Sequence, residues 1–162
     1  MDKRIVILGI VILLVLVLVL FGVYIRMKYT SQEGVRVIVY HQGKEIKLNP
    51  EITDFKELQK KGESLFVNAN DALDLIVTGR TIEKAKEETT SVEILYSKPK
   101  EFTFQLGKPY TQKVDALLIS LDNKSAVIYY SVNGSYSSGP YVNTKEEVKK
   151  VRDLLQDIED FN

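Results

Sequence analysis

The sequence predicts a small α+β domain preceded by a single transmembrane helix. Residues Ile5 to Ile25 contain no charged side chain. Further along the chain, apolar residues alternate with polar ones in several short runs, which is typical of half-buried strands. Two other stretches repeat apolar residues every three or four positions, as amphipathic helices do. These three observations together predict the architecture.

The apolar stretch from Ile5 to Ile25 is long enough to cross a bilayer as a helix. Its 21 residues would span about 31 Å at the α-helical rise, against a hydrocarbon core of about 30 Å. The stretch is longer than the apolar core of a cleavable secretory signal, and no small-residue cleavage site follows it. We therefore expect an uncleaved signal-anchor between a short tail, residues 1–4, and a polar tether, residues 26–34.

The charges around this helix say little about its orientation, because Lys3 and Arg4 on one side are balanced by Arg26 and Lys28 on the other. A short tail before a signal-like apolar stretch most often stays in the cytoplasm. We therefore expect a cytoplasmic N-terminus and an external domain, residues 35–162, at the cell membrane.

Alternating patterns predict strands in both halves of this domain. Asn133-Gly134 is a strong turn signal between two of them. The predicted strands are 35–40 and 45–48, which form a hairpin around Gly43, then 92–96 and 102–106 on either side of Pro99, then 114–121 and 126–132, and a short edge strand at 136–141.

A long helix is predicted between the first hairpin and the later strands. Asp54 is a suitable N-cap, apolar residues then recur every three or four positions as far as Ile76, and Gly79 is placed to end the helix. Weak helix formers at residues 68–71 allow a break there. The charged stretch 81–90 is then either a helical turn or a solvated connector.

A second helix is predicted at the C-terminal end. Thr144 and Glu147 have the spacing of a capping box, and the apolar positions that follow share one helical face. These positions are Val148, Val151, Leu155 and Ile158. The order of elements indicates an α+β fold, in which one antiparallel sheet packs against both amphipathic helices on one face.

Composition excludes several classes of function. The chain has no cysteine, which excludes disulfide frameworks, thiolate metal sites and a cysteine nucleophile. Residues 29–162 carry 18 basic and 21 acidic side chains, so the domain lacks the basic character on which nucleic-acid binding depends. No glycine pattern matches a phosphate-cradling loop. We expect no nucleic-acid partner, no nucleotide and no cofactor.

No motif predicts catalysis or metal binding. The single histidine, His41, lies in a predicted turn, and no local sequence supplies it with a nucleophile or a metal-ligand partner. The carboxylates occur mainly in charged runs, which indicates solvated side chains rather than a convergent acid pair. We therefore predict no catalytic residue, no metal ligand and a protein that is not an enzyme.

Tyrosine is the one residue type that stands out in the second half of the domain. Consecutive Tyr129 and Tyr130 must face opposite sides of a strand, so one of them is expected to point away from the core. The segment 133–141 combines Tyr, Ser, Gly and Asn, the residues that recognition loops use for contact area and adaptable hydrogen bonds. Candidate partner-binding residues are Tyr129, Tyr130, Tyr136 and Tyr141.

These observations favour a single-pass membrane protein whose external domain binds a protein or an envelope component. Under this hypothesis, Tyr136→Ala and Tyr141→Ala leave the fold intact and abolish binding. Two alternatives remain open. One is a small membrane-tethered hydrolase that uses an unidentified pair of carboxylates, and the other is an accessory subunit of a larger membrane complex, in which the apolar helix is the contact.

Overall fold

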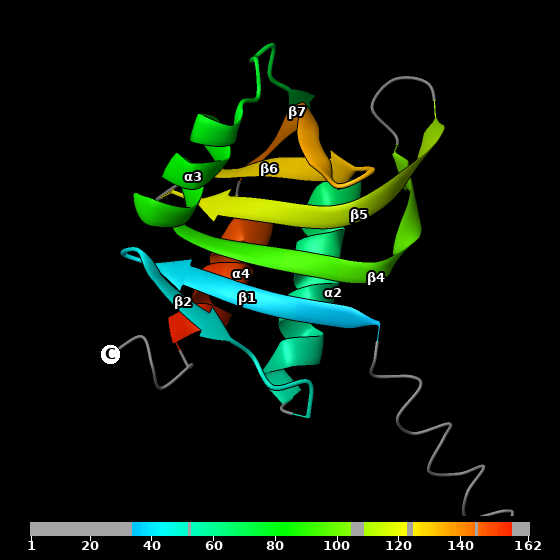
Figure 1. The fold of residues 1–162 in the computed structure, drawn as a ribbon. Coiled ribbons are helices and arrows are strands. Elements are labelled where there is room, and N and C mark those ends of the chain that lie inside the picture. The colour runs from blue at the N-terminus through cyan, green and yellow to red at the C-terminus, as the bar shows by residue number, and fades with distance from the viewer. Residues whose placement is uncertain (1–33, 52, 105–108, 123–124, 145, 157–162) are drawn as a thin grey trace, which may run out of the picture. The chain divides into compact units, whose positions relative to one another are not determined.

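The computed structural model describes residues 34–51, 53–104, 109–122, 125–144 and 146–156 (Figure 1). The predicted membrane helix 5–25 and tail 1–4 lie outside the described residues, as does the tether except for its last residue, Gly34. Across the described ranges, no helix has the length and apolar character needed to cross a membrane.

An antiparallel sheet of seven strands forms the centre of the described domain, in the order β2-β1-β4-β5-β6-β7-β3. Every neighbouring pair is antiparallel. The strands are β1 Val35–His41, β2 Lys44–Lys47, β3 Asp71–Ala72, β4 Thr90–Phe104, β5 Tyr110–Leu121, β6 Ser125–Val132 and β7 Ser135–Thr144. The predicted small α+β domain with an antiparallel sheet is confirmed.

Both predicted hairpin turns are present. Gln42 and Gly43 join β1 to β2 with φ values of 50° and 76°, and Asn133 and Gly134 join β6 to β7 with 51° and 76°. Positive φ at both central positions is the geometry of a type I′ turn, which matches the twist of the flanking strands. Asn and Gly adopt this left-handed region at little cost, which explains why the Asn133-Gly134 signal was informative.

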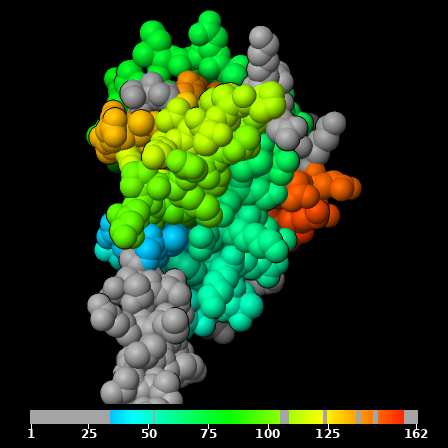
Figure 2. Space-filling view, turned by 90° about the vertical axis from the view of Figure 1, so that its right-hand side faces the viewer, coloured from blue at the N-terminus to red at the C-terminus, as the bar shows by residue number. Residues whose placement is uncertain are grey.

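Two helices, α2 (Thr53–Val67) and α4 (Glu146–Gln156), cover one face of the sheet as predicted (Figure 1). In Figure 2 they form the teal and orange-red layer beside the green strands. Their apolar faces join the inward-facing residues of the strands in one large core. Fully buried members include Leu58, Leu65 and Phe66 of α2 together with Ile94, Leu117, Ile119 and Ile128 of the sheet.

The predicted long helix does not reach Ile76: α2 ends at Val67, at the break that the weak helix formers of residues 68–71 allow. The side chain of Asn68 turns back to donate a hydrogen bond to the carbonyl of Ser64 at 3.0 Å. The amide of buried Asn143, on β7, donates to the carbonyls of Leu65 and Asn68 at 3.0 and 3.1 Å. A distant strand thus satisfies carbonyls at the end of this helix, where intrahelical partners run out.

A third helix, α3 (Gly79–Glu87), covers the opposite face of the sheet, in addition to the two helices predicted for the first face. Gly79 begins this helix rather than ending the previous one. Thr78 is its N-cap and forms a capping box with Thr81. Ile82 and Ala85 are buried against Leu118 and Tyr129, so the charged stretch 81–90 is largely an amphipathic helix and not a solvated connector.

Three predicted strands also differ from the structure. Pro99 does not separate 92–96 from 102–106, because β4 continues through it with a shift of register between Leu95 and Lys100. Such an irregularity accommodates a residue that has no N–H to donate. Strand β7 is not an edge strand, because the two-residue β3 pairs with it at Tyr141 and Val142.

Candidate functional site

The four candidate tyrosines do not form one surface. Tyr129 and Tyr130 face opposite sides of β6, as predicted, but both are buried, at 8% and 7% exposed. Tyr130 and Tyr141 belong to the core under α2, where their rings stack 5.8 Å apart. Tyr129 and Tyr136 lie on the other side of the sheet, with α3. We call this side the α3 face.

Burial changes what is expected of the alanine variants. Tyr141 is 9% exposed and its ring contacts those of Phe66, Phe104 and Tyr130. Truncation of such a side chain removes apolar contacts throughout the cluster. We therefore expect Tyr141→Ala to destabilise the domain, so a loss of partner binding by this variant would not locate a binding surface.

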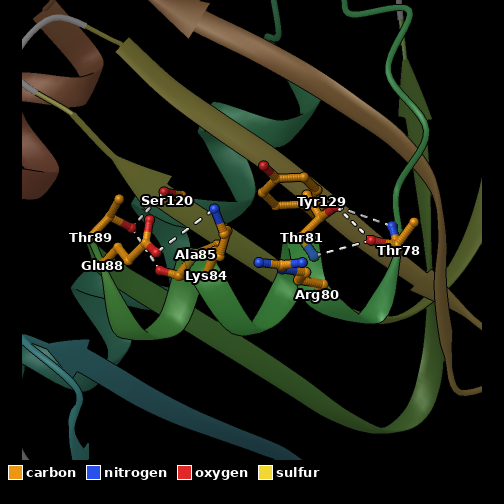
Figure 3. Close-up of a pocket in the computed structure, with 9 residues that line it drawn as sticks. All are labelled: Thr78, Arg80, Thr81, Lys84, Ala85, Glu88, Thr89, Ser120 and Tyr129. Carbon is orange, nitrogen blue, oxygen red and sulfur yellow. Dashed lines mark hydrogen bonds and ion pairs between the residues drawn. The ribbon is translucent and has the colours of Figure 1, made fainter.

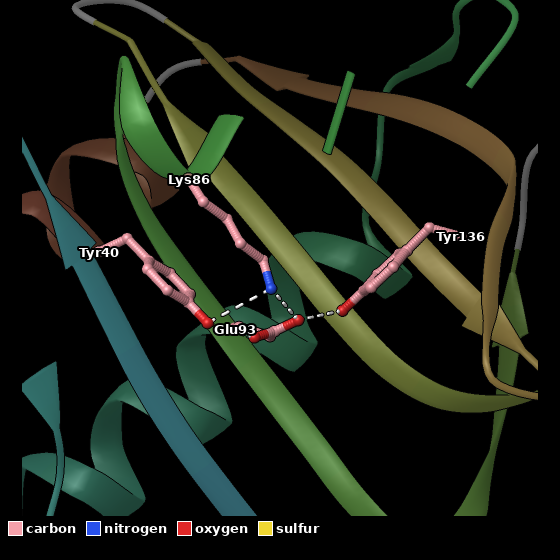
Figure 4. A network of polar contacts seen from close by, with 4 residues as sticks. All are labelled: Tyr40, Lys86, Glu93 and Tyr136. Atoms are coloured by element: carbon pink, nitrogen blue, oxygen red, sulfur yellow. Dashed lines mark hydrogen bonds and ion pairs between the residues drawn. The ribbon is translucent and has the colours of Figure 1, made fainter. Parts of the chain in front are cut away.

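A cluster of polar side chains lies at the centre of the α3 face (Figure 4). Glu93, on β4, is only 4% exposed. Its Oε2 accepts a hydrogen bond from the Tyr40 hydroxyl, and its Oε1 accepts from the Tyr136 hydroxyl and from Lys86 Nζ, each at 2.8 Å. Lys86 Nζ also donates to the Tyr40 hydroxyl at 3.3 Å. We call these four residues the Glu93 cluster.

The Glu93 cluster connects β4 to three other elements of the fold. Tyr40 comes from β1, Tyr136 from β7 and Lys86 from α3. Burial and the neighbouring Glu93 carboxylate raise the pKa of both phenols well above the usual value, so they remain protonated donors. Because these donors are mutually satisfied with Glu93, the cluster is suited to fixing α3 on the sheet.

The sequence does not predict this cluster. Alternation in the predicted strand 92–96 places Glu93 on the face opposite Val92 and Ile94. Such a position is solvent-exposed when one face of a sheet is open to water. Only the presence of α3 on that face turns it into a buried site. The nearest sequence signal is the recurrence of Ile82 and Ala85 in the charged stretch.

Raising the pH above about 10 is expected to destabilise the domain. Burial and a hydrogen bond with Tyr110 raise the pKa of Tyr141 to about 12, and the pKa values of Tyr40 and Tyr136 also rise. The folded state therefore holds these protons more tightly than the unfolded chain does. Their contribution to stability is complete below the unfolded pKa and is lost as the pH rises through the folded pKa values.

An alkaline titration would check this expectation by following phenolate absorbance and circular dichroism together. We expect the buried tyrosines to ionise only as the secondary-structure signal is lost. Ionisation of all tyrosines near the ordinary pKa, with the fold retained, would contradict it.

A pocket opens between α3 and the strands beside it (Figure 3). We call it the α3 pocket. Arg80 and Lys84 lie four residues apart on α3, which places them on the same side of the helix. Figure 3 shows Thr78 and Arg80 towards one end and Thr89, Glu88 and Ser120 towards the other. The lining residues are Thr78, Arg80, Thr81, Lys84, Ala85, Glu88, Thr89, Ser120 and Tyr129.

Some polar groups of the α3 pocket have hydrogen-bond partners and others do not. The Thr89 hydroxyl donates to the Ala85 carbonyl at 2.6 Å and bonds the Ser120 hydroxyl at 2.7 Å. Lys84 approaches Glu88 only loosely, at 3.9 Å. Neither the Arg80 guanidinium nor the Tyr129 hydroxyl has a partner among the described residues. Burial raises the pKa of Tyr129, so its hydroxyl remains a potential donor.

A second pocket lies along α2 and includes Glu147 of α4. Its two carboxylates, Glu57 and Glu147, are each paired with a lysine, at 3.3 Å to Lys61 and 2.7 Å to Lys150. The hydrogen bond from Lys150 lowers the pKa of Glu147. An acid catalyst needs the opposite shift, because it must hold its proton near neutral pH. Glu147 is therefore not suited to the role of the acid in such a pair of carboxylates.

His41 lies at the end of β1, where its Nδ1 is 2.8 Å from the Thr90 hydroxyl. Within the part of the chain that the structure describes, no group of three or more potential ligands could hold a metal ion.

No family model, curated protein or solved structure matches this chain. The functional inference therefore depends on the side chains of the domain and on the sequence that precedes it.

Proposed function

We propose that this chain is a single-pass membrane protein of the cell membrane whose external domain binds a protein or an envelope component. Residues 5–25 form the anchor, residues 1–4 stay in the cytoplasm, and residues 35–162 form the binding domain. The protein acts by binding and not by catalysis. The uncharged 21-residue stretch supports the anchor, and the α3 pocket supports the binding role.

The unused hydrogen-bonding groups of the α3 pocket carry this proposal. Arg80 and Tyr129 offer donors without partners in the described structure. The segment that leads into α3 adds an apolar contact area, since Leu75 is 58% and Ile76 is 88% exposed. Exposed aliphatic side chains beside a polar pocket are typical of interaction surfaces. We therefore propose that residues 75–84 form the binding surface together with Tyr129, which is the one candidate tyrosine that lines the α3 pocket.

Anchoring favours this kind of function. A domain held near a membrane meets other envelope molecules at a raised effective concentration, so modest contacts are sufficient. Leu75 and Ile76 follow the edge strand β3, whereas the α3 pocket lies over the interior strands β5 and β6.

Protease accessibility of a tag placed after Asn162 tests the topology. We expect cleavage of the tag in intact cells, or after osmotic opening of any outer layer, without lysis of the cell membrane. Protection until the membrane itself is lysed would place the domain in the cytoplasm and contradict the proposal.

A photo-crosslinking residue at Ile76 tests the binding surface in living cells. We expect a discrete crosslinked species at this position. The matched control is the same residue at Lys44, which is exposed on the opposite edge strand β2, where no such species is expected. Equal crosslinking at both positions, or none at Ile76, would contradict a partner at this surface.

Exchange of residues 5–25 for an unrelated apolar helix should leave the crosslink unchanged, whereas an accessory subunit that binds through its helix would lose it.

A further inference from the structure

The α3 pocket has a cationic end and an acceptor end. In Figure 3, Arg80 lies towards one end, Glu88 and Ser120 towards the other, and Lys84 between them. The first turn of α3 contains no acidic residue, so the positive end of the helix dipole adds to the charge of Arg80. An anionic group is therefore favoured at the Arg80 end.

Tyr129 provides the independent observation that points to a ligand. Its side chain is 8% exposed, yet its hydroxyl has no partner among the described residues and lines the pocket (Figure 3). Its hydroxyl oxygen is not among the fully buried unpaired atoms of the described residues, so it reaches the open pocket. A ligand oxygen there would supply an acceptor for this hydroxyl.

The hydroxyl pair at the other end accepts hydrogen bonds and cannot donate them. Thr89 uses its only hydroxyl proton on the Ala85 carbonyl, at 2.6 Å. The 2.7 Å bond between Thr89 and Ser120 must therefore use the proton of Ser120. Ser120 is left with acceptor lone pairs, and the Glu88 carboxylate beside it is also an acceptor. This end of the pocket suits ligand hydroxyl groups.

We propose that the α3 pocket binds the phosphate ester of a polyol, with the phosphate at Arg80, Lys84 and Tyr129 and the polyol hydroxyls at Ser120 and Glu88. Phosphate matches the guanidinium geometry and has enough oxygens to accept from all three donors. The inference deepens the proposed function and rests on it only for the choice of surface. The same chemistry occurs in soluble polyol phosphates and in phosphoglycerol lipid headgroups.

Titration of the full-length isotope-labelled chain in nonionic detergent, followed by amide NMR shifts, tests this site. Glycerol 3-phosphate is the probe, and we expect saturable shifts at α3 and β6 with a Kd on the order of 1 mM. Arg80→Gln should weaken binding by about tenfold or more, as for a lost charge-assisted hydrogen bond. Tyr129→Phe, which keeps the buried ring, should weaken it by roughly two- to tenfold.

Arg36→Gln is the matched control, because Arg36 is an exposed arginine on β1 that does not line the pocket. It should leave the affinity unchanged. Equal weakening by Arg36→Gln and Arg80→Gln, equal binding of uncharged glycerol, or the absence of saturable shifts would overturn the proposal. All variants alter exposed positions or keep the buried ring, and the NMR spectrum itself reports whether each one folds.

A competition arm identifies the source of the ligand. Nanodiscs that contain phosphatidylglycerol, compared with phosphatidylcholine alone, would weaken the apparent affinity for glycerol 3-phosphate if the pocket takes lipid headgroups. Unchanged affinity would assign it to soluble polyol phosphates. Both results support the site. Because the titration depends on neither topology nor a protein partner, its failure is distinguishable from failure of the protease and crosslinking tests.

Discussion

Replacing Phe66 by alanine is expected to lower the free energy of unfolding by about 3–5 kcal/mol. Phe66 lies on α2 and is completely buried. Its ring meets the edges of Phe102 and Phe104 at centroid distances of 5.2 and 4.5 Å, and it also contacts Tyr130 and Tyr141. Its removal leaves a cavity between α2 and the strands β4, β6 and β7, which the surrounding rings cannot fill without leaving their own contacts.

Urea unfolding followed by circular dichroism measures this loss. Ile76→Ala is the matched control, because the side chain of Ile76 is also large and apolar but is 88% exposed. It should change stability by no more than about 0.5 kcal/mol. A loss below about 1 kcal/mol for Phe66→Ala would show that this aromatic core is not packed as described.

Replacing Glu93 by alanine is expected to lower the free energy of unfolding by roughly 3 kcal/mol. The change leaves the Lys86 ammonium and two partly buried phenols without their acceptor. The value lies at the low end for a broken buried pair, because the Lys86 side chain is 26% exposed and part of its charge can be solvated. Glu45→Ala is the matched control, since Glu45 pairs with Lys47 at a largely exposed position, and it should have an effect of about 0.5 kcal/mol or less.

Removing the charges of both Glu93 and Lys86 separates the cost of an unpaired lysine from the cost of the lost tyrosine hydrogen bonds. Glu93→Leu combined with Lys86→Met leaves no unpaired charge, so we expect the double variant to be more stable than Glu93→Ala. If the two were equally unstable, the loss would come from the tyrosine hydrogen bonds and not from the uncompensated lysine. An effect of Glu93→Ala no larger than that of Glu45→Ala would contradict the burial of the cluster.

Local patterns were sufficient for most elements of the domain. Alternation located the hairpin around Gly43 and the strands β4 to β6, and Asn133-Gly134 located a turn because few residues adopt positive φ at low cost. The apolar repeats of α2 and α4 placed both helices on one face of the sheet. These features depend on residues close together in the chain, so a sequence is enough to predict them.

Contacts between segments that are distant in the sequence determined where α2 ends and how α3 packs. Helix α2 ends at Val67 because Asn143, more than seventy positions away, hydrogen-bonds Leu65 and Asn68. The stretch 81–90 becomes a packed helix only because Leu118 and Tyr129 provide a surface for it.

The candidate site depends on distant contacts in the same way. Composition singled out the tyrosines, but burial separated Tyr130 and Tyr141 from Tyr129 and Tyr136, and it assembled the Glu93 cluster from β1, α3, β4 and β7. The spacing of Arg80 and Lys84 is visible in the sequence, yet the hydroxyls that complete the α3 pocket come from β5 and β6. Periodicity predicts which face of an element is apolar, whereas the partner that covers that face is set by tertiary packing.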